Sequence, residues 1–384
     1  MKTVGELLME VKETPQAGDD PPVLTLTEHN GFVRQSDRFK KRLALEDTSG
    51  YKVVRRNNIA FNPYLLWAGA VAQNTIVDAG VISPLYPTFQ VRDGYDPRFV
   101  ARLLLTPQLV CAYDGIAFGS VPRRRRSSVA DFLALPLAHV PGLGEQQRIA
   151  AILDHADALR ARRRHVLTHL DSLPQSIFHE MFGDPDEADE TVPFGEVTAL
   201  VGGRSLVADD SAAHSEYRVL KISAVTTGQF KPGESKPLPT GYVPPTRHLV
   251  RSGDLLMSRA NTTELVGAVA YVVATPPNLA LPDKVWRLEW KVDAQPIYWH
   301  ALLSTPTIRR RISRLSSGTG GSMKNIAKAK LETMPVPLIS VGRQREFAVR
   351  AAKVSQRGAN MRHLRSLEDE LVASLQARAF RGGL

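Results

Sequence analysis

The chain has 384 residues, 43% of them hydrophobic, which is enough apolar material for two folded domains and excludes a largely disordered protein. Its single cysteine excludes an intramolecular disulfide and a zinc site built on cysteines. The formal net charge of +10 favours an acidic polymer as partner. Because the sequence shows neither a signal-peptide pattern nor a long apolar run, we expect a soluble, cytoplasmic protein without membrane contact.

Residues 1–142 are expected to form a first globular domain. Short runs typical of strands, such as residues 23–26 and 81–82, alternate with proline and glycine. Residues 54–61 have the pattern of a tight turn that leads into a buried strand. This mixture predicts an α+β domain rich in turns.

Residues 143–183 have the composition of one long helix. Their apolar side chains recur at alternating steps of three and four, which is typical of a helix that packs along another helix. The predicted contact positions are Ile149, Ile152, Leu159, Val166, Leu170, Leu173 and Ile177. At about 1.5 Å per residue the helix would be roughly 57 Å long. Pro174 is expected to kink it or to separate its last turns.

A second copy of this helix follows a second globular domain over residues 184–341. At a shift of 198 residues, the matched positions are Gly144 with Gly342, Gln146 with Gln344, Ser176 with Ser374, and Phe182 with Phe380. The second helix covers residues 342–384. Its predicted contact positions are Phe347, Val354, Met361, Leu364, Leu371 and Leu375. The predicted fold class is α+β, with two pseudo-repeated globular domains separated by two long helices that form an antiparallel, coiled-coil-like pair.

Two loops are candidates for holding the phosphates of an acidic polymer such as a nucleic acid. One is the arginine run at residues 123–126, and the other is the glycine-rich stretch at residues 316–324, which lacks the spacing of a P-loop or a dinucleotide loop. A flexible turn is the alternative for the second loop. Arginine, asparagine and glutamine elsewhere can read base edges, although ordinary exposed loop chemistry is equally compatible with each of them. The residues predicted to bind such a polymer are Arg34, Gln35, Arg38, Lys40, Lys41, Arg123, Arg124, Arg125, Arg126, Arg259, Asn261, Thr262, Gly320, Lys324 and Lys328.

No catalytic residue and no metal site is predicted. Asn62-Pro63-Tyr64 lacks the second proline of a DNA amino-methyltransferase motif. His179-Glu180 lacks the second histidine of a zinc-hydrolase helix. His165 and His169 share a helix face but have no third metal ligand nearby in the sequence.

The order of parts is more specific than any single motif. Leu135-Pro136-Leu137 precedes the first helix, Glu145-Gln146 opens it, and Phe182-Gly183-Asp184 closes it. The second half of the chain has a turn and strand at residues 251–256, followed by the glycine-rich stretch. In this order the chain resembles the DNA-specificity subunits of Type I restriction-modification systems.

The resemblance implies two target-recognition domains that read a bipartite, asymmetric DNA sequence, and a chain without catalytic activity. It implies double-stranded DNA, modification methyltransferase subunits and restriction or translocase subunits as partners, in a system of phage defence that involves DNA methylation. S-adenosylmethionine, ATP and magnesium would be bound by those partners, and no cofactor by this chain. The alternatives are a DNA methyltransferase or nuclease with a divergent active site, and a coiled-coil scaffold with incidental basic patches.

Overall fold

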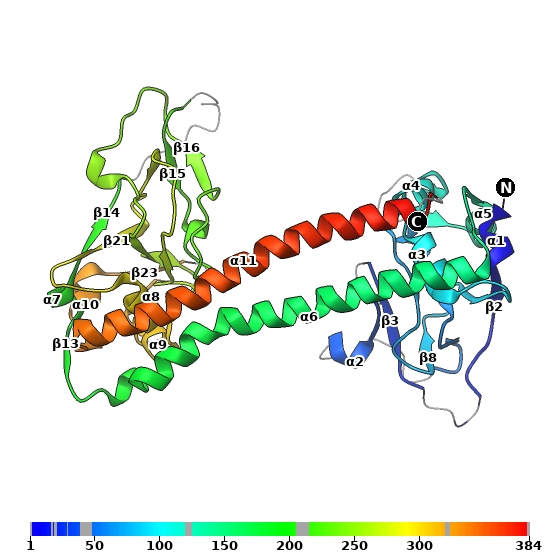
Figure 1. Ribbon diagram of the computed structural model, residues 1–384, viewed down its shortest axis with the longest axis horizontal. Helices are drawn as coiled ribbons and strands as arrows, with labels where there is room; N and C mark the ends of the chain where they lie inside the picture. Colours follow the sequence, from blue (N-terminus) through cyan, green and yellow to red (C-terminus); the bar gives the residue numbers. More distant parts are fainter. Residues whose placement is uncertain are drawn as a thin grey trace. The chain divides into compact units, whose positions relative to one another are not determined.

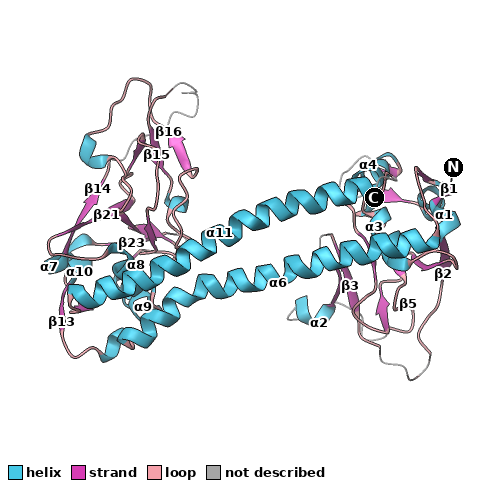
Figure 2. Ribbon diagram, in the orientation of Figure 1, coloured by secondary structure: helices cyan, strands magenta, loops and turns pink. Residues whose placement is uncertain are grey.

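The computed structural model describes residues 2–16, 18, 21–28, 30–38, 48–119, 125–204, 215–318 and 323–381. The chain divides into two compact units. Unit 1 is Met1–Arg163 with Leu364–Leu384, and unit 2 is Arg164–His363. Each unit contains strands, short helices and part of both long helices (Figures 1 and 2).

The centre of unit 1 is a four-stranded antiparallel sheet in the order β2-β9-β6-β7. Its strands are β2 (Leu8–Val11), β9 (Thr88–Val91), β6 (Ile59–Phe61) and β7 (Val71–Gln73). Phe61 and Phe89 are fully buried, with ring centroids 5.8 Å apart, and both rings pack against Phe132. Aromatic side chains on adjacent strands suit a sheet with one buried face.

The remaining elements of unit 1 are short. The paired strands are β1 (Lys2–Thr3) with β12 (Pro136–Leu137), β3 (Leu24–Thr27) with β4 (Gly31–Arg34), β5 (Lys52–Arg55) with β8 (Ala79–Ile82), and β10 (Ala117–Phe118) with β11 (Arg126–Ser127). The helices are α1 (Val4–Leu7), α2 (Gln35–Arg38), η1 (Leu66–Ala68), α3 (Pro97–Leu104), α4 (Pro107–Gly115) and α5 (Val129–Ala134). Both α3 and α4 start with proline, which suits a first helical turn because its N–H groups have no partner within the helix.

The central sheet of unit 2 has the equivalent order, β14-β21-β17-β19, and is also antiparallel. Its strands are β14 (Thr198–Gly202), β21 (Val285–Trp290), β17 (Leu255–Ser258) and β19 (Val269–Tyr271). In chain order these strands correspond one to one with those of unit 1. The repeat seen in the helices therefore extends to the sheets.

Unit 2 has two further three-stranded sheets. One has the order β16 (Ser235–Pro237), β15 (Arg218–Leu220), β20 (Leu279–Ala280), and the other β18 (Ala260–Asn261), β23 (Lys324–Ile326), β22 (Ser316–Ser317). A two-stranded ladder joins β13 (Thr191–Pro193) to β24 (Pro335–Pro337). The helices are η3 (Pro185–Glu187), α7 (Phe194–Val197), η4 (Ile222–Ala224), η5 (Thr246–His248), α8 (Pro296–Ser304), α9 (Pro306–Leu315) and α10 (Lys328–Glu332).

A matching glycine stands in the first short helix of each unit. A Cβ on Gly5 in α1 would lie 3.2 Å from the carbonyl oxygen of Leu133 in α5. A Cβ on Gly195 in α7 would lie 2.9 Å from the Cβ of Glu332 in α10. A side chain at Gly195 would force α7 and α10 apart, and one at Gly5 would be tight against α5.

The long helices are α6 (Leu143–Phe182), which continues through Pro174, and α11 (Val341–Ala379). In unit 1 the first half of α6 lies beside the second half of α11, where Arg160 and Asp369 form an ion pair of 2.7 Å. In unit 2 the second half of α6 contacts the first half of α11, and the rings of Phe178 and Phe347 lie 5.7 Å apart. The start of each helix thus meets the end of the other, so the pairing is antiparallel.

A buried glutamine anchors the first turn of each long helix. The side-chain oxygen of Gln146 accepts a hydrogen bond from the backbone N–H of Asp96 (3.0 Å), and its amide group donates to the carbonyl of Pro141 (2.8 Å). Gln344 makes the equivalent bonds with Gln295 (3.1 Å) and Ile339 (2.8 Å). Each glutamine therefore ties its helix to the residue that precedes α3 or α8.

Five of the predicted helix-contact positions have side chains largely open to solvent. They are 40–58% exposed: Leu159, Val166, Leu173, Leu364 and Leu371. The other predicted positions are buried or half-buried: Ile149, Ile152, Leu170, Ile177, Phe347, Val354, Met361 and Leu375.

A shift of one residue explains the exposed positions of α6. Leu167 is buried next to exposed Val166, and half-buried Arg160 follows exposed Leu159. Arg160 reaches Asp369, and Arg163 forms a 2.5 Å ion pair with Glu368. A pattern that follows only apolar residues passes over arginines whose charge is neutralised by the facing helix.

Candidate nucleic-acid interface

In unit 2 one small sheet brings together predicted residues that are far apart in the sequence. Asn261 of β18 pairs with Lys324 of β23. Arg259 precedes β18, and its carbonyl accepts a hydrogen bond from the N–H of Ile326 (3.1 Å). Thr262 follows β18, and its N–H donates to the side-chain oxygen of Asn261 (2.8 Å). Four of the predicted DNA-binding residues therefore share one surface.

The guanidinium of Arg259 lies over an aromatic ring. Its central carbon is 5.6 Å from the ring centroid of Trp286, which is only 5% exposed, whereas Arg259 itself is exposed. Attraction between a cation and the face of an indole ring holds the guanidinium in place. Its N–H groups then remain available for an anionic ligand.

The glycine-rich hairpin β22–β23 next to this surface is closed by backbone contacts. A Cβ on Gly318 would lie 2.6 Å from the carbonyl oxygen of Met323, so the turn requires glycine there. The ammonium of Lys324 donates to the carbonyl of Gly318 (2.9 Å). Gly320 lies outside the described residues.

Lys328 follows this hairpin but has a structural role. Its ammonium donates to the carbonyl of Leu200 in β14 (3.1 Å) and lies 3.8 Å from the carboxylate of Glu332. The lysine therefore fastens α10 to the central sheet.

The hairpin β10–β11 has the same place in unit 1, between α4 and α5, as β22–β23 has between α9 and α10. The exposed guanidinium of Arg126 lies 5.9 Å from the ring centroid of Tyr64. Phe118 is the partner of Arg126 in the ladder and is 66% exposed. Unit 1 thus also presents an arginine over an aromatic ring beside its hairpin.

The side chain of Arg125 is bound to other residues of unit 1. It forms a 2.6 Å ion pair with Asp114 and donates to the carbonyl of Ala117 (3.1 Å). These contacts join the end of α4 to the hairpin. Arg123 and Arg124 lie outside the described residues.

The remaining predicted residues of unit 1 lie where β4 runs into α2. Arg34 ends β4 and Arg38 ends α2, and both side chains are exposed. The N–H of Gln35 donates to the carbonyl of Val23 (2.9 Å), which fixes the turn between the two elements. Lys40 and Lys41 fall outside the described part of the chain.

Sequence reasoning singled out the arginine run at residues 309–311 but missed the aromatic partners and the half-buried setting of Arg309. No local pattern links Tyr64 to Arg126 or Trp286 to Arg259. Arg309 in α9 donates to the carbonyl of Glu264 (2.8 Å), and burial lowers the pKa of its guanidinium. It stays charged because arginine does not deprotonate in proteins, so it adds positive potential beneath the loop that follows β18.

The described residues hold no cluster of three or more histidine, cysteine, aspartate or glutamate side chains that could bind a metal ion. Within the same residues, no helix is long and apolar enough to cross a membrane.

No protein-family model matches the chain. Over 276 residues, 66% of its length, the chain is 25% identical to the Type I restriction enzyme EcoKI specificity subunit of Escherichia coli K12, and it covers 58% of that relative. The chain is similar to Type I specificity subunits. The S subunit of a Type I restriction-modification system from M. genitalium has a TM-score of 0.57 at 13% identity, covering 99% of this chain and 95% of that one. A chain from a structural study of the assembly of a type I system has a TM-score of 0.58 at 15% identity, covering 100% and 97%.

This similarity to Type I specificity subunits confirms the resemblance drawn from the sequence. It also confirms the predicted fold class of two α+β globular regions and two long helices. The solved structures share the fold along nearly the whole chain, whereas the sequence match covers about two thirds of it.

Proposed function

We propose that the chain is a sequence-specific DNA-binding subunit of a Type I restriction-modification complex, which reads a bipartite, asymmetric target. One observation carries the proposal: two units with equivalent sheets each present an exposed arginine over an aromatic ring beside a hairpin. The similarity to specificity subunits supports it. Because the two units differ in the residues around these hairpins, they would read two different half-sites.

Phosphate contacts would fix the position of each unit on the duplex. Arg126 and Arg259 are exposed cations whose location is set by a ring, which suits binding to a phosphate without reading a base. Asn261 and Gln35 are amide side chains of the kind that can pair with adenine in the major groove. In this proposal the arginines supply affinity and the amides supply sequence preference.

The chain itself would be non-catalytic and would act in the cytoplasm. It would position modification methyltransferase subunits and restriction subunits, and those partners would bind S-adenosylmethionine, ATP and magnesium. We base this division of labour on the similarity to specificity subunits.

The arginines can be tested by titrating labelled duplexes of random sequence with purified chain and following fluorescence anisotropy. Arg126→Ala and Arg259→Ala should each weaken binding to every sequence and reduce the slope of log affinity against log salt by about one, because each removes one phosphate contact. Arg162→Ala on α6 is the matched control, since it removes an exposed arginine far in sequence from either hairpin. A changed sequence preference with an unchanged salt slope would instead make these arginines base readers.

The function as a whole is tested by mapping methylated sites in DNA from cells that contain this chain and its methyltransferase partner. We expect two unlike half-sites with a fixed gap. A palindromic or continuous site would contradict the proposal, and the absence of any preferred site would favour a scaffold. Binding of S-adenosylmethionine to the purified chain would favour a divergent methyltransferase.

A further inference from the structure

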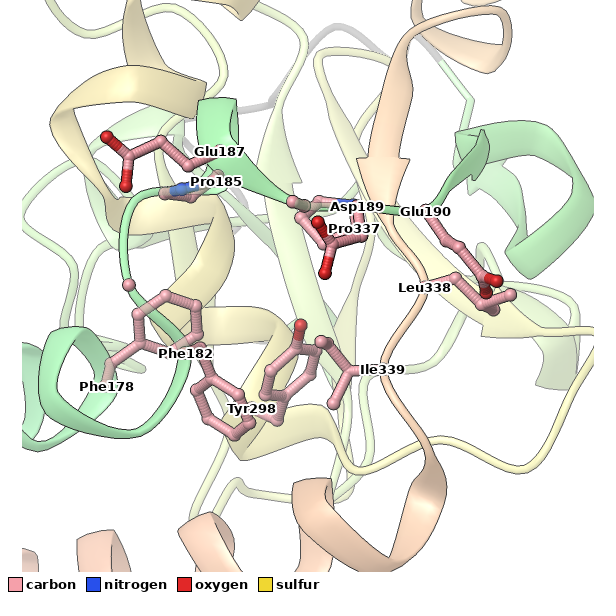
Figure 3. A pocket seen from close by; sticks show the side chains of 12 residues that line it. Phe178, Phe182, Pro185, Glu187, Asp189, Glu190, Tyr298, Pro337, Leu338 and Ile339 are labelled. Carbon is pink, nitrogen blue, oxygen red and sulfur yellow. The ribbon is translucent and has the colours of Figure 1, made fainter.

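Unit 2 contains a cavity of about 370 Å³ where α6 ends and the chain crosses to β13. Figure 3 shows its lining side chains, which come from the end of α6, the linker at residues 183–190, α8, the end of β24 and the segment that follows β24. A cavity of this size is in the range that binds small organic molecules or single side chains. Neither β18 nor the hairpin β22–β23, which we propose to contact DNA, lines the cavity.

The floor of the cavity is aromatic. The ring of Tyr298 lies 5.6 Å from that of Phe178 and 5.2 Å from that of Phe182, measured between centroids. The guanidinium of Arg343 lies 5.5 Å from the centroid of Phe182, so this cluster already accepts a cation on one of its rings. Aromatic faces attract cations because their ring quadrupole is negative above and below the plane.

The hydroxyl group of Tyr298 has no partner. The side chain is fully buried, and its oxygen makes no hydrogen bond with any part of the chain that the structure describes. Figure 3 shows this hydroxyl pointing away from α8 toward the linker that carries Asp189. A buried polar group without a partner is costly, so an unexplained one calls for a ligand or another functional reason.

Comparison with unit 1 shows that packing does not require this hydroxyl. Tyr298 is the third residue of α8, and the third residue of α3 is Phe99. Phe99 packs on Phe380 with centroids 5.4 Å apart, as Tyr298 packs on Phe182. The equivalent contact therefore forms without an oxygen in unit 1, and the oxygen is specific to the unit that has the cavity.

The rim of the cavity is acidic. Glu187, Asp189 and Glu190 line it and are exposed, and none of them forms an ion pair with another described residue. Their neighbour Asp186, in contrast, pairs with Arg311. These carboxylates are also too dispersed to form a metal site, since the described residues contain no suitable group of three.

We propose that this cavity binds an organic cation, an ammonium or guanidinium group carried on a short apolar stem. The stem packs on Phe178 and Phe182, the cationic group donates hydrogen bonds to the rim carboxylates, and the hydroxyl of Tyr298 accepts one from it. The cation is either a free amine or the lysine or arginine side chain of a partner protein. This inference does not depend on DNA binding.

The test is isothermal titration calorimetry of the purified full chain with benzylammonium and with its neutral counterpart, benzyl alcohol. Benzylammonium should bind at one site and about tenfold more tightly than the alcohol, because only the cation gains charge-assisted hydrogen bonds and attraction to the rings. Asp189→Asn combined with Glu190→Gln should remove most of that difference. Glu180→Gln is the matched control, since it neutralises an exposed acid on α6 that does not line the cavity.

Tyr298→Phe separates ligand binding from packing. We expect a higher melting temperature, because an unpartnered buried hydroxyl is removed, together with weaker binding of benzylammonium. Equal affinity for the amine and the alcohol, or undiminished amine binding in the double variant, would overturn the proposal.

Three further probes distinguish the source of the cation. N-acetyl-lysine methylamide and N-acetyl-arginine methylamide represent side chains of a partner protein, and putrescine represents a free amine. Binding of the amino-acid probes supports a partner side chain, and binding of putrescine alone supports a small molecule. Binding of neither class would contradict the proposal.

Discussion

The two units share their interior but differ in what surrounds it. Both have a four-stranded sheet of equivalent order, a glycine in the first short helix, and a buried glutamine at the start of a long helix. Unit 1 adds the β3–β4 and β5–β8 ladders, which share a small apolar core around Leu24, whereas unit 2 adds the β16-β15-β20 sheet, which has a small apolar core around Leu238. A few interior contacts are therefore enough to specify the common scaffold, and the surrounding strands are free to diverge.

The largest expected effect comes from the equivalent aromatic contacts of α3 and α8. Phe99→Ala and Tyr298→Ala should each lower the free energy of unfolding of their own unit by about 3–5 kcal/mol, because each removes a fully buried ring. Hydrogen exchange measured by mass spectrometry reports each unit separately. Cys111→Ala, at an exposed position of α4, serves as the control. If Phe99→Ala destabilised both units equally, the division into two compact units would be wrong.

The glutamine anchors should give a smaller effect. Gln146→Ala and Gln344→Ala should each lower the free energy of unfolding by about 1–3 kcal/mol, because an N–H and a carbonyl that are at least half-buried lose their partners. Gln147→Ala is the matched control, since Gln147 is exposed on the same turn of α6. Equilibrium denaturation followed by circular dichroism measures the three variants. If Gln146→Ala lowered the free energy of unfolding and Gln344→Ala did not, the two glutamines would not be equivalent anchors.

Some of these shared features could be predicted from the sequence and others could not. The match of Gln146 with Gln344 was visible because long helices conserve spacing, so one shift of 198 residues aligns them. The equivalence of Gly5 and Gly195 was missed because their separation is 190 residues and the motif is short. Strand order was not predictable, since pairing such as that of Asn261 with Lys324 depends on tertiary structure. The same limit hid the rings beneath Arg126 and Arg259.

The two units differ in one helix cap, and the stability that this cap provides depends on pH. In unit 1 the carboxylate of Asp96 accepts hydrogen bonds from the N–H groups of Arg98 (2.8 Å) and Phe99 (3.2 Å), whereas Gln295 in unit 2 makes no side-chain cap. Burial disfavours the charge of Asp96, but hydrogen bonds from the Arg98 side chain and from these N–H groups outweigh it and lower its pKa. The carboxylate is thus more acidic in the folded chain than in the unfolded one.

Asp96→Ala should therefore cost unit 1 about 1 kcal/mol at neutral pH. The stabilisation from ionised Asp96 is complete above the carboxyl pKa of the unfolded chain, about 4, and is lost as the pH falls through the lower folded value. Denaturation at a series of pH values should show that the difference in free energy of unfolding between wild type and Asp96→Ala becomes smaller below about pH 4. The stability of unit 2 should not differ between them, and a gap that stayed constant with pH would show that the charge of Asp96 is irrelevant.

The smallest effect is expected from moving the chain ends. In unit 2 the linker at residues 183–190 connects α6 to β13, which pairs with β24. In unit 1 the equivalent elements are the end of α11 and β1, which pairs with β12, and no chain segment connects them. Unit 1 therefore folds without such a linker, so unit 2 should do so as well.

A permutant that opens between Ala188 and Asp189 and joins the original ends by a copy of the linker should keep its helical circular dichroism and solubility. The control opens inside β21 between Leu288 and Glu289, which breaks a strand paired on both sides and should prevent folding. Loss of helical signal in the first permutant would contradict the equivalence of the two units. Because Asp189 lines the rim of the cavity, the folded permutant should also bind benzylammonium more weakly, which separates the role of the linker in ligand binding from its role in folding.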